Sequence, residues 1–401
     1  MAHPPDPSPP FHPLQSDEDA PFEDLMAARV HATLAWGQVQ GKLSHLPTDV
    51  AHQFCAALTR LMLVEALAHS GFSGAEGWFS AWFSGLAPVP GVTTQTTAPA
   101  ALVAGTLLSE LSLSAWEPLG QAAAQIRAAA RFDQDRHHAV PEIPPAFAVE
   151  EATRLAESYA RGSKGDWPLA ALDHLYDAAA GSPHFAPVER NRQLLALPSG
   201  PVAFEQARPA MALWALDLVA GPLIARSNPG FPPLPLPGTL RAEALRPELW
   251  PRERAILVAQ AAEKAVQRVS EQLDVAYARV QAMQAAISSL RSTSRAPLLY
   301  RLLAGFGPLR PLQIEQALAV SKNGARDLVA ALVKAGLAET TAHRHQAVVR
   351  ALPPPRTPIV PAAEGEAAAD SPYAEHDSIM AEIDGLLARA NASCRGDDLK
   401  D

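Results

Sequence analysis

Apolar residues recur along most of this chain at intervals of three and four, which is the spacing of amphipathic helices. A clear short example is predicted from Thr48 to His69, where Phe54, Leu58 and Met62 share one face. Alanine and leucine dominate and runs of β-branched residues are scarce, so the pattern predicts a mainly α fold. Helices are predicted over 22–36, 48–69, 75–83, 99–113, 116–131, 148–161, 167–180 and 203–225, with proline-broken stretches at 182–202 and 228–238.

A longer periodic segment follows Pro251, a residue suited to the first position of a helix. Its apolar residues alternate spacings of four and three, the pattern of a coiled-coil seam. We expect a long amphipathic helix over residues 247–291, roughly 60 Å in length at about 1.5 Å per residue. It packs either against a second copy, as a homodimer through residues 262–290, or against the N-terminal helices. The alanine content of the seam slightly favours packing within the chain. The seam comprises Ala262, Val266, Val269, Leu273, Ala276, Val280, Met283, Ile287 and Leu290.

Two short helices joined by a tight turn are predicted between Pro311 and Gly336. The first ends at about Leu318, and Ser321 is placed to cap the second by accepting an unpaired backbone N–H. In the second helix the apolar residues form a stripe that we expect to be buried. The stripe consists of Ala325, Leu328, Val329 and Leu332. This is the layout of a helix-turn-helix, whose second helix enters the DNA major groove.

Polar residues of the second helix gather at its N-terminal end, where a recognition helix presents the residues that read DNA. Arg326 is suited to a bidentate hydrogen bond with guanine, and Asn323 to adenine or to phosphate. Lys322 is a candidate phosphate contact, and the helix N-terminus itself favours an anion. The exposed set is predicted to be Lys322, Asn323, Gly324, Arg326 and Asp327, with Ser321 counted among the DNA-binding residues.

The residues that follow Gly336 predict a β-hairpin with strands over 337–340 and 346–351. Its tip suits contact with a phosphate backbone or the minor groove, through His343, Arg344 and His345, and Arg350 is a further candidate contact on the second strand. A helix over 298–306 precedes the motif. Residues 292–352 together predict a winged helix-turn-helix.

Charge is distributed unevenly along the chain, whose formal net charge is −9. Residues 1–24 hold six acids and no Lys or Arg, and residues 351–401 hold ten acids and four bases. In contrast, residues 291–350 hold nine bases and three acids, about +6. The basic segment coincides with the predicted helix-turn-helix, which favours a nucleic-acid partner over an ordinary α-hairpin.

Length and composition bound the remaining possibilities. A chain of 401 residues holds roughly two or three domains of about 100–200 residues each. The N-terminus has no signal-peptide pattern, and no apolar run reaches about 18 residues without charge or proline, so we expect a cytoplasmic protein with no membrane partner. The predicted domains are a disordered acidic, proline-rich tail (1–21), a helical domain (22–238), the long helix (247–291), the winged helix (292–352) and an acidic tail (353–401) with a short amphipathic helix (374–391).

Other groupings of chemically active residues give weaker signals. The run from Asp133 to His138 contains metal-ligand residue types, but a solvated polar loop is the better interpretation. His52 and Cys55 share a helix face, although a core cysteine beside an ordinary histidine explains them better. The aromatic residues from Trp78 to Phe83 are more often core than a ligand pocket. We therefore predict no catalytic site, no metal and no cofactor.

Residues 251–352 resemble an uncharacterised bacterial family, often plasmid-borne, that has a C-terminal helix-turn-helix DNA-binding domain. The resemblance is carried by the long helix, then Arg291-Ser-Thr-Ser-Arg-Ala-Pro297, then Asn323-Gly-Ala-Arg-Asp-Leu-Val329 and a short wing. Residues 25–85 are more loosely similar to that family's N-terminal region. The chain also resembles AMP-transferring Fic-type proteins, but their His-Pro-Phe…Gly-Asn-Gly-Arg loop is absent; Pro183-His-Phe185 lacks the glycines that cradle phosphate.

The resemblance implies a transcriptional or plasmid-associated regulator, and the motif itself predicts double-stranded DNA as the partner. Two alternatives remain open. The winged helix and the seam would bind protein in an adaptor, and a degenerate enzyme would have a polar pocket with convergent titratable groups in the N-terminal domain. We expect a protein that is not an enzyme.

Overall fold

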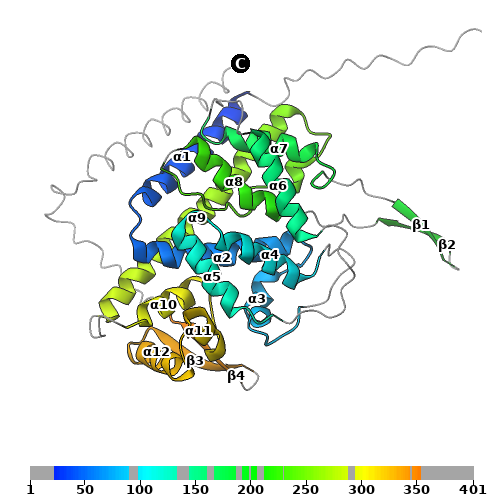
Figure 1. Ribbon diagram of the computed structural model, residues 1–401. Helices are drawn as coiled ribbons and strands as arrows, with labels where there is room; N and C mark the ends of the chain where they lie inside the picture. Colours follow the sequence, from blue (N-terminus) through cyan, green and yellow to red (C-terminus); the bar gives the residue numbers. More distant parts are fainter. Residues whose placement is uncertain are drawn as a thin grey trace, which may run out of the picture. The chain divides into compact units, whose positions relative to one another are not determined.

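The computed structural model describes residues 22–89, 98–132, 144–159, 167–186, 192–197, 200–205, 212–228, 230–287, 294–343 and 346–353. These residues are mainly helical, as the apolar pattern predicted (Figure 1). The first half contains α1 (Phe22–Ser44), α2 (Thr48–His69), α3 (Ala75–Phe83), α4 (Ala100–Ser112), α5 (Glu117–Ala129), α6 (Pro145–Tyr159) and α7 (Ala170–Ala180). The second half contains β1 (Arg192–Leu197), β2 (Gly200–Glu205), α8 (Leu213–Ser227), the 3-10 helix η1 (Ala242–Leu245), α9 (Pro251–Ile287), α10 (Ala296–Gly305), α11 (Pro311–Leu318), α12 (Lys322–Lys334), β3 (Ala338–His343) and β4 (Gln346–Ala351).

Helix α2 lies at the centre of the core and packs against α4, α5, α8, α9 and α10. Its predicted apolar stripe is fully buried, with Phe54, Leu58 and Met62 all at 0% exposure. By length and composition α2 alone among the described helices would suffice to cross a membrane, yet 72% of its apolar window is buried inside the protein. Burial of that extent is what the core helix of a globular protein shows.

Helix α9 packs along α1 and also contacts α2 and α7. The seam residues from Ala262 to Met283 are buried by these neighbours. This part of the predicted seam is therefore covered by helices of the same chain. Of the two alternatives, packing against the N-terminal helices is the one observed. A homodimer through this seam would have to displace α1. The helix begins at Pro251, four residues later than predicted.

The proline-rich segment after α8 is part of the core. Phe231, Leu234 and Leu236 are almost completely buried, so this segment contributes side chains to the interior. It passes so close to α8 that a Cβ added at Gly221 would lie 1.7 Å from the Leu234 carbonyl oxygen. Only glycine permits that approach.

Strands β1 (192–197) and β2 (200–205) pair in an antiparallel arrangement that the sequence did not predict. The expected helix over 203–225 is wrong at its start, because residues 203–205 belong to β2 and α8 begins at Leu213. The expected helix over 22–36 is too short, since α1 continues to Ser44. The predicted helix over residues 374–391 and the predicted tail over 1–21 lie outside the described residues.

The elements from α10 to β4, within residues 294–353, are called the C-terminal segment here, and those from α1 to α9 the helical body. The C-terminal segment packs directly on the helical body. Helix α10 lies against α2, and α11 lies against α5. The Gln313 side-chain amide is buried and donates to the Ala129 carbonyl at 2.8 Å and to the Phe83 carbonyl at 3.4 Å. One Arg310 guanidinium N–H donates to the Ser84 carbonyl at 3.0 Å. These contacts fix the positions of α10 and α11.

Candidate nucleic-acid interface

A tight turn joins α11 to α12. Ala319 takes the left-handed conformation there, with φ 48° and ψ 51°, and α12 begins three residues later at Lys322. Ser321 then has extended backbone angles, and its hydroxyl accepts the Gly324 N–H at 3.1 Å. The predicted cap is therefore present, and it satisfies one backbone donor of the first turn of α12.

Helix α12 packs against α10, α11 and β3. On its inner face Ala325 and Leu332 are buried, while Leu328 and Val329 are half-buried. The opposite face exposes Lys322, Asn323, Arg326, Asp327 and, at the helix end, Lys334. The prediction for α12 therefore holds for Ala325 and Leu332 and in part for Leu328 and Val329, whereas Gly324, which was predicted to be exposed, is half-buried.

The hairpin β3–β4 follows Gly336, whose φ of 69° allows the chain to leave α12. The strands pair from Ala338 with Ala351 to His343 with Gln346, so β3 begins one residue later and ends three residues later than the predicted strand. On the other side of β4, Val349 exchanges two backbone hydrogen bonds with Leu309, of 2.8 and 3.0 Å. The hairpin is therefore attached to the chain between α10 and α11.

The two wing residues that the structure describes have different environments. His343 is exposed at the end of β3. Arg350 lies directly opposite Glu339 in the hairpin register, and its Nε donates to the Glu339 carboxylate. This cross-strand pair neutralises much of the charge that Arg350 would bring to an anion. Arg344 and His345, the other two predicted contacts, lie outside the described residues.

The basic segment uses several of its arginines internally. Arg295 donates to the Leu318 carbonyl at 3.1 Å, and Arg301 forms an ion pair with Asp49 on α2. With Arg310 on Ser84 and Arg350 on Glu339, four of the nine bases hold the fold together. Lys322, Arg326 and Lys334 form no ion pair in the described part of the chain. Among the bases of this segment that the structure describes, those without an ion pair or a backbone partner are therefore on α12.

The other predicted groupings serve the core. Cys55 is fully buried, and that burial raises the pKa of its thiol well above the usual range. His52 instead contacts the Thr48 carbonyl at 2.7 Å and the Gln121 side-chain oxygen at 2.9 Å. No cluster of three or more His, Cys, Asp or Glu side chains among the described residues could hold a metal ion. The run 133–138 lies outside those residues.

The predicted aromatic cluster on α3 is part of the core, which agrees with the simpler of its two interpretations. Phe79, Trp82 and Phe83 are buried. Phe83 packs edge-on against Phe306 from the end of α10, with ring centroids 4.7 Å apart, and Trp82 stacks on Phe132 at 4.8 Å. These rings help to join the helical body to the C-terminal segment.

A buried polar network that the sequence did not reveal lies between α2 and α8. Asp217 is completely buried and accepts the backbone N–H groups of Gly238 at 2.7 Å and Leu240 at 2.8 Å. His69 lies beside it, with Nδ1 at 3.8 Å from the Asp217 carboxylate. Burial raises the pKa of Asp217 to about 8 and lowers the pKa of His69 to about 4. The carboxyl group ties the segment after α8 to the core.

Comparison with known proteins gives no match: no family model and no curated protein is similar to this chain. The functional assignment therefore depends on the residues and their geometry, and the family resemblance of residues 251–352 stays a prediction.

Proposed function

We propose that α10, α11, α12 and the β3–β4 hairpin form a winged helix-turn-helix that binds double-stranded DNA, and that the protein is a transcriptional or plasmid-associated regulator. The observation that carries this proposal is the outer face of α12. It exposes Lys322, Asn323 and Arg326 within the first turns of a helix that Ser321 caps. A recognition helix presents its reading residues in that position.

In this proposal α12 enters the major groove. Arg326 donates two hydrogen bonds to the O6 and N7 atoms of a guanine, and Asn323 contacts an adjacent base or phosphate. Lys322 lies at the positive end of the helix dipole and neutralises a phosphate. His343 brings the wing to the neighbouring backbone. Arg350 contributes less than the sequence predicted, because it already pairs with Glu339.

Selection of bound duplexes from a random library tests sequence-specific binding. We expect enrichment of a site, and on that site Arg326→Ala costs about 1–3 kcal/mol of binding free energy and relaxes the preference at one base pair. Arg127→Ala is the matched control, because Arg127 lies on α5 and donates to Ser109 and Ser112. If Arg326→Ala lowers the affinity equally for all DNA sequences, Arg326 contacts a phosphate and not a base. The absence of any enriched site would contradict sequence-specific recognition.

An adaptor that binds protein is the second candidate. The same segment exposes Leu312 on α11 and Val333 on α12, at 46% and 44% exposure, and exposed apolar side chains are common in protein contacts. The coiled-coil seam, which this alternative also required, is already covered by α1 and α2. In the adaptor alternative, only the surface of the C-terminal segment is therefore left to bind a protein partner.

A further inference from the structure

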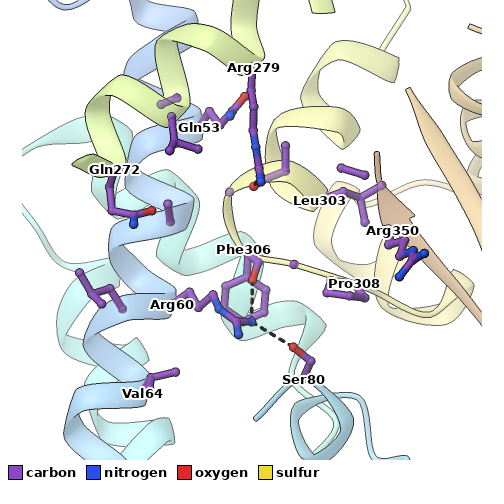
Figure 2. Close-up of a pocket in the computed structure, with 18 of the residues that line it drawn as sticks. Gln53, Arg60, Val64, Ser80, Gln272, Arg279, Leu303, Phe306, Pro308 and Arg350 are labelled. Atoms are coloured by element: carbon purple, nitrogen blue, oxygen red, sulfur yellow. Dashed lines mark hydrogen bonds between the residues drawn. The ribbon is translucent and has the colours of Figure 1, made fainter. Parts of the chain in front are cut away.

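A cavity of about 640 Å³ opens between the helical body and the C-terminal segment (Figure 2). Its walls come from α2, α3 and α9 on one side, and from the end of α10, the loop that follows it and β4 on the other. Sites for small molecules typically have volumes of about 300–1,000 Å³. The cavity is thus large enough for a metabolite, and of the proposed DNA contacts only Arg350 lines it.

The lining of this cavity is strongly basic. Four arginines and a single carboxylate contribute to it, so the lining has a formal charge of +3. Figure 2 shows three of these arginines on three different elements, with Arg60 on α2, Arg279 on α9 and Arg350 on β4. Three of the four have carboxylate partners: Arg60 pairs with Glu76 at 2.6 Å, Arg268 pairs with Glu65 at 3.1 Å, and Arg350 pairs with Glu339.

Arg279 is the exception. It forms no ion pair in the described part of the chain; one of its terminal N–H groups donates to the Ala304 carbonyl. Its Nε is buried and has no hydrogen-bond partner among the described residues. The Gln53 side-chain oxygen, on the same lining, is also buried without a partner. A guanidinium that binds only a neutral carbonyl keeps its full charge, and an unsatisfied buried donor costs free energy until a ligand meets it.

Apolar side chains complete the walls, among them Leu61, Val64, Val275 and Leu303. A guanidinium matches the planar or tetrahedral oxygens of a carboxylate or phosphate, whereas an apolar wall favours a hydrocarbon or ring portion. We propose that this cavity binds a small organic anion, whose phosphate or carboxylate group pairs with Arg279 and whose remaining atoms lie on the apolar wall.

Such a ligand would touch both sides of the cavity at once. Arg279 belongs to α9, while Ala304 and Gly307 belong to the end of α10 and its loop, and Arg350 belongs to β4. A bound anion therefore stabilises the packing of the C-terminal segment on the body. If the proposed function holds, the bound anion also changes the affinity for DNA, because it favours one arrangement of the winged helix. This effect on DNA binding rests on the proposed function, whereas the binding of the anion does not.

Calorimetric titration of the full chain without DNA tests the site, with inorganic pyrophosphate and succinate as probes at constant ionic strength. We expect one of the two probes to bind saturably, with one molecule per chain. The probe that binds shows whether the anionic group of the ligand is a phosphate or a carboxylate. Arg279→Gln should weaken this binding by about tenfold or more, since a charge-assisted pair is lost. Val275→Glu should do the same by repulsion, and it changes a side chain that is 42% exposed, so the fold survives.

Arg127→Gln, on the surface of α5, should leave the affinity unchanged. The absence of saturable heat with both probes would overturn the site, and equal binding by all four proteins would mean an adventitious ion only. A separate arm adds the bound probe to a DNA-binding assay. If the anion binds but the affinity for DNA does not change, the coupling is wrong and the site stands; if no DNA binds at all, the proposed function fails while the titration remains valid.

Discussion

At the turn between α11 and α12, Ala319 holds a backbone conformation that side chains with a Cβ disfavour. The left-handed region costs an L-residue about 1–2 kcal/mol, which is why similar turns often use glycine. The residue is exposed, so neither packing nor a side-chain contact requires alanine. The geometry of the turn, and not the chemistry of this side chain, positions α12.

Ala319→Gly should therefore raise the free energy of unfolding by about 0.5–1 kcal/mol, since relief of strain exceeds the added entropy of the unfolded chain. Ala330→Gly is the matched control, because Ala330 is exposed within α12 and glycine in a helix interior costs about 1 kcal/mol. Urea unfolding measures both variants. Equal destabilisation by the two substitutions would show that Ala319 is not strained.

The buried carboxyl group of Asp217 makes the free energy of unfolding depend on pH. Burial raises its folded pKa from 3.8 to about 8, so the folded state holds the proton more tightly than the unfolded chain does. The contribution of the protonated group is complete below the unfolded pKa and is lost as the pH rises through about 8. Asn is neutral throughout, so the stability of the wild type relative to Asp217→Asn should fall steadily from about pH 5 to about pH 8 and level off above that.

Thermal unfolding of both proteins across that range measures the difference. His69, whose folded pKa is lowered to about 4, stays neutral there and does not disturb the comparison. If the wild type instead gains stability relative to Asp217→Asn as the pH rises, the carboxylate is the favoured form, held by the Gly238 and Leu240 N–H groups.

Among the elements, α10 shows how closely the C-terminal segment packs on the body. A Cβ added at Gly305 would lie 2.4 Å from the Gln53 carbonyl oxygen and 2.8 Å from the Ala56 Cβ. Both atoms belong to the buried helix α2, which cannot move away cheaply. Glycine at this position thus sets the separation between α10 and α2.

Gly305→Ala should lower the free energy of unfolding by about 1–3 kcal/mol, the usual cost of overpacking. Gly37→Ala is the control, because Gly37 lies within α1 with no atom near its added Cβ, and alanine there should stabilise the helix by about 0.5–1 kcal/mol. Hydrogen exchange adds a local measurement: amides of α10 and α11 should lose protection first. Unchanged stability in Gly305→Ala would mean that α10 is loosely packed.

Helix identities were more predictable than the contacts between helices. The apolar spacing located α2, α3 and α12 because each presents a continuous stripe to the core. The hairpin β1–β2 gave no such signal, since Arg192–Leu197 consists mostly of good helix formers. Asp217 could not be linked to the N–H groups it accepts, because nothing in a local pattern marks a pairing over more than twenty residues.

At the candidate site, the sequence predicted correctly that Lys322, Asn323 and Arg326 are exposed on α12. It overestimated the charge that residues 291–350 leave free for a ligand. Periodicity separates exposed Lys322 and Arg326 from buried Ala325 and Leu332. The count of nine bases, however, does not show which of them form ion pairs or hydrogen bonds within the fold. The Arg301 pair with Asp49 joins residues that are distant in the sequence, and only the packing of α10 on α2 brings them together.

For the whole molecule, a net charge of −9 opposes general attraction to DNA, so the proposed DNA binding has to arise from the small basic surface on α12 and the β3–β4 hairpin. Each phosphate that a protein neutralises contributes about −0.9 to the slope of log affinity against log salt. Lys322 and Lys334, together with the proposed contacts of the β3–β4 hairpin, therefore predict a slope of roughly −2 to −4 per bound module. That value is modest for a DNA-binding protein.

The most direct test of the central claim is a salt titration of binding to random duplex DNA, followed by fluorescence anisotropy from about 20 to 200 mM salt. We predict measurable affinity at low salt that falls along this slope, and a slope shallower by about 0.9 in Lys322→Gln. Lys264→Gln, on α9, is the control and should leave the slope unchanged. No affinity at low salt, or the same slope in Lys322→Gln as in the wild type, would contradict DNA binding through α12.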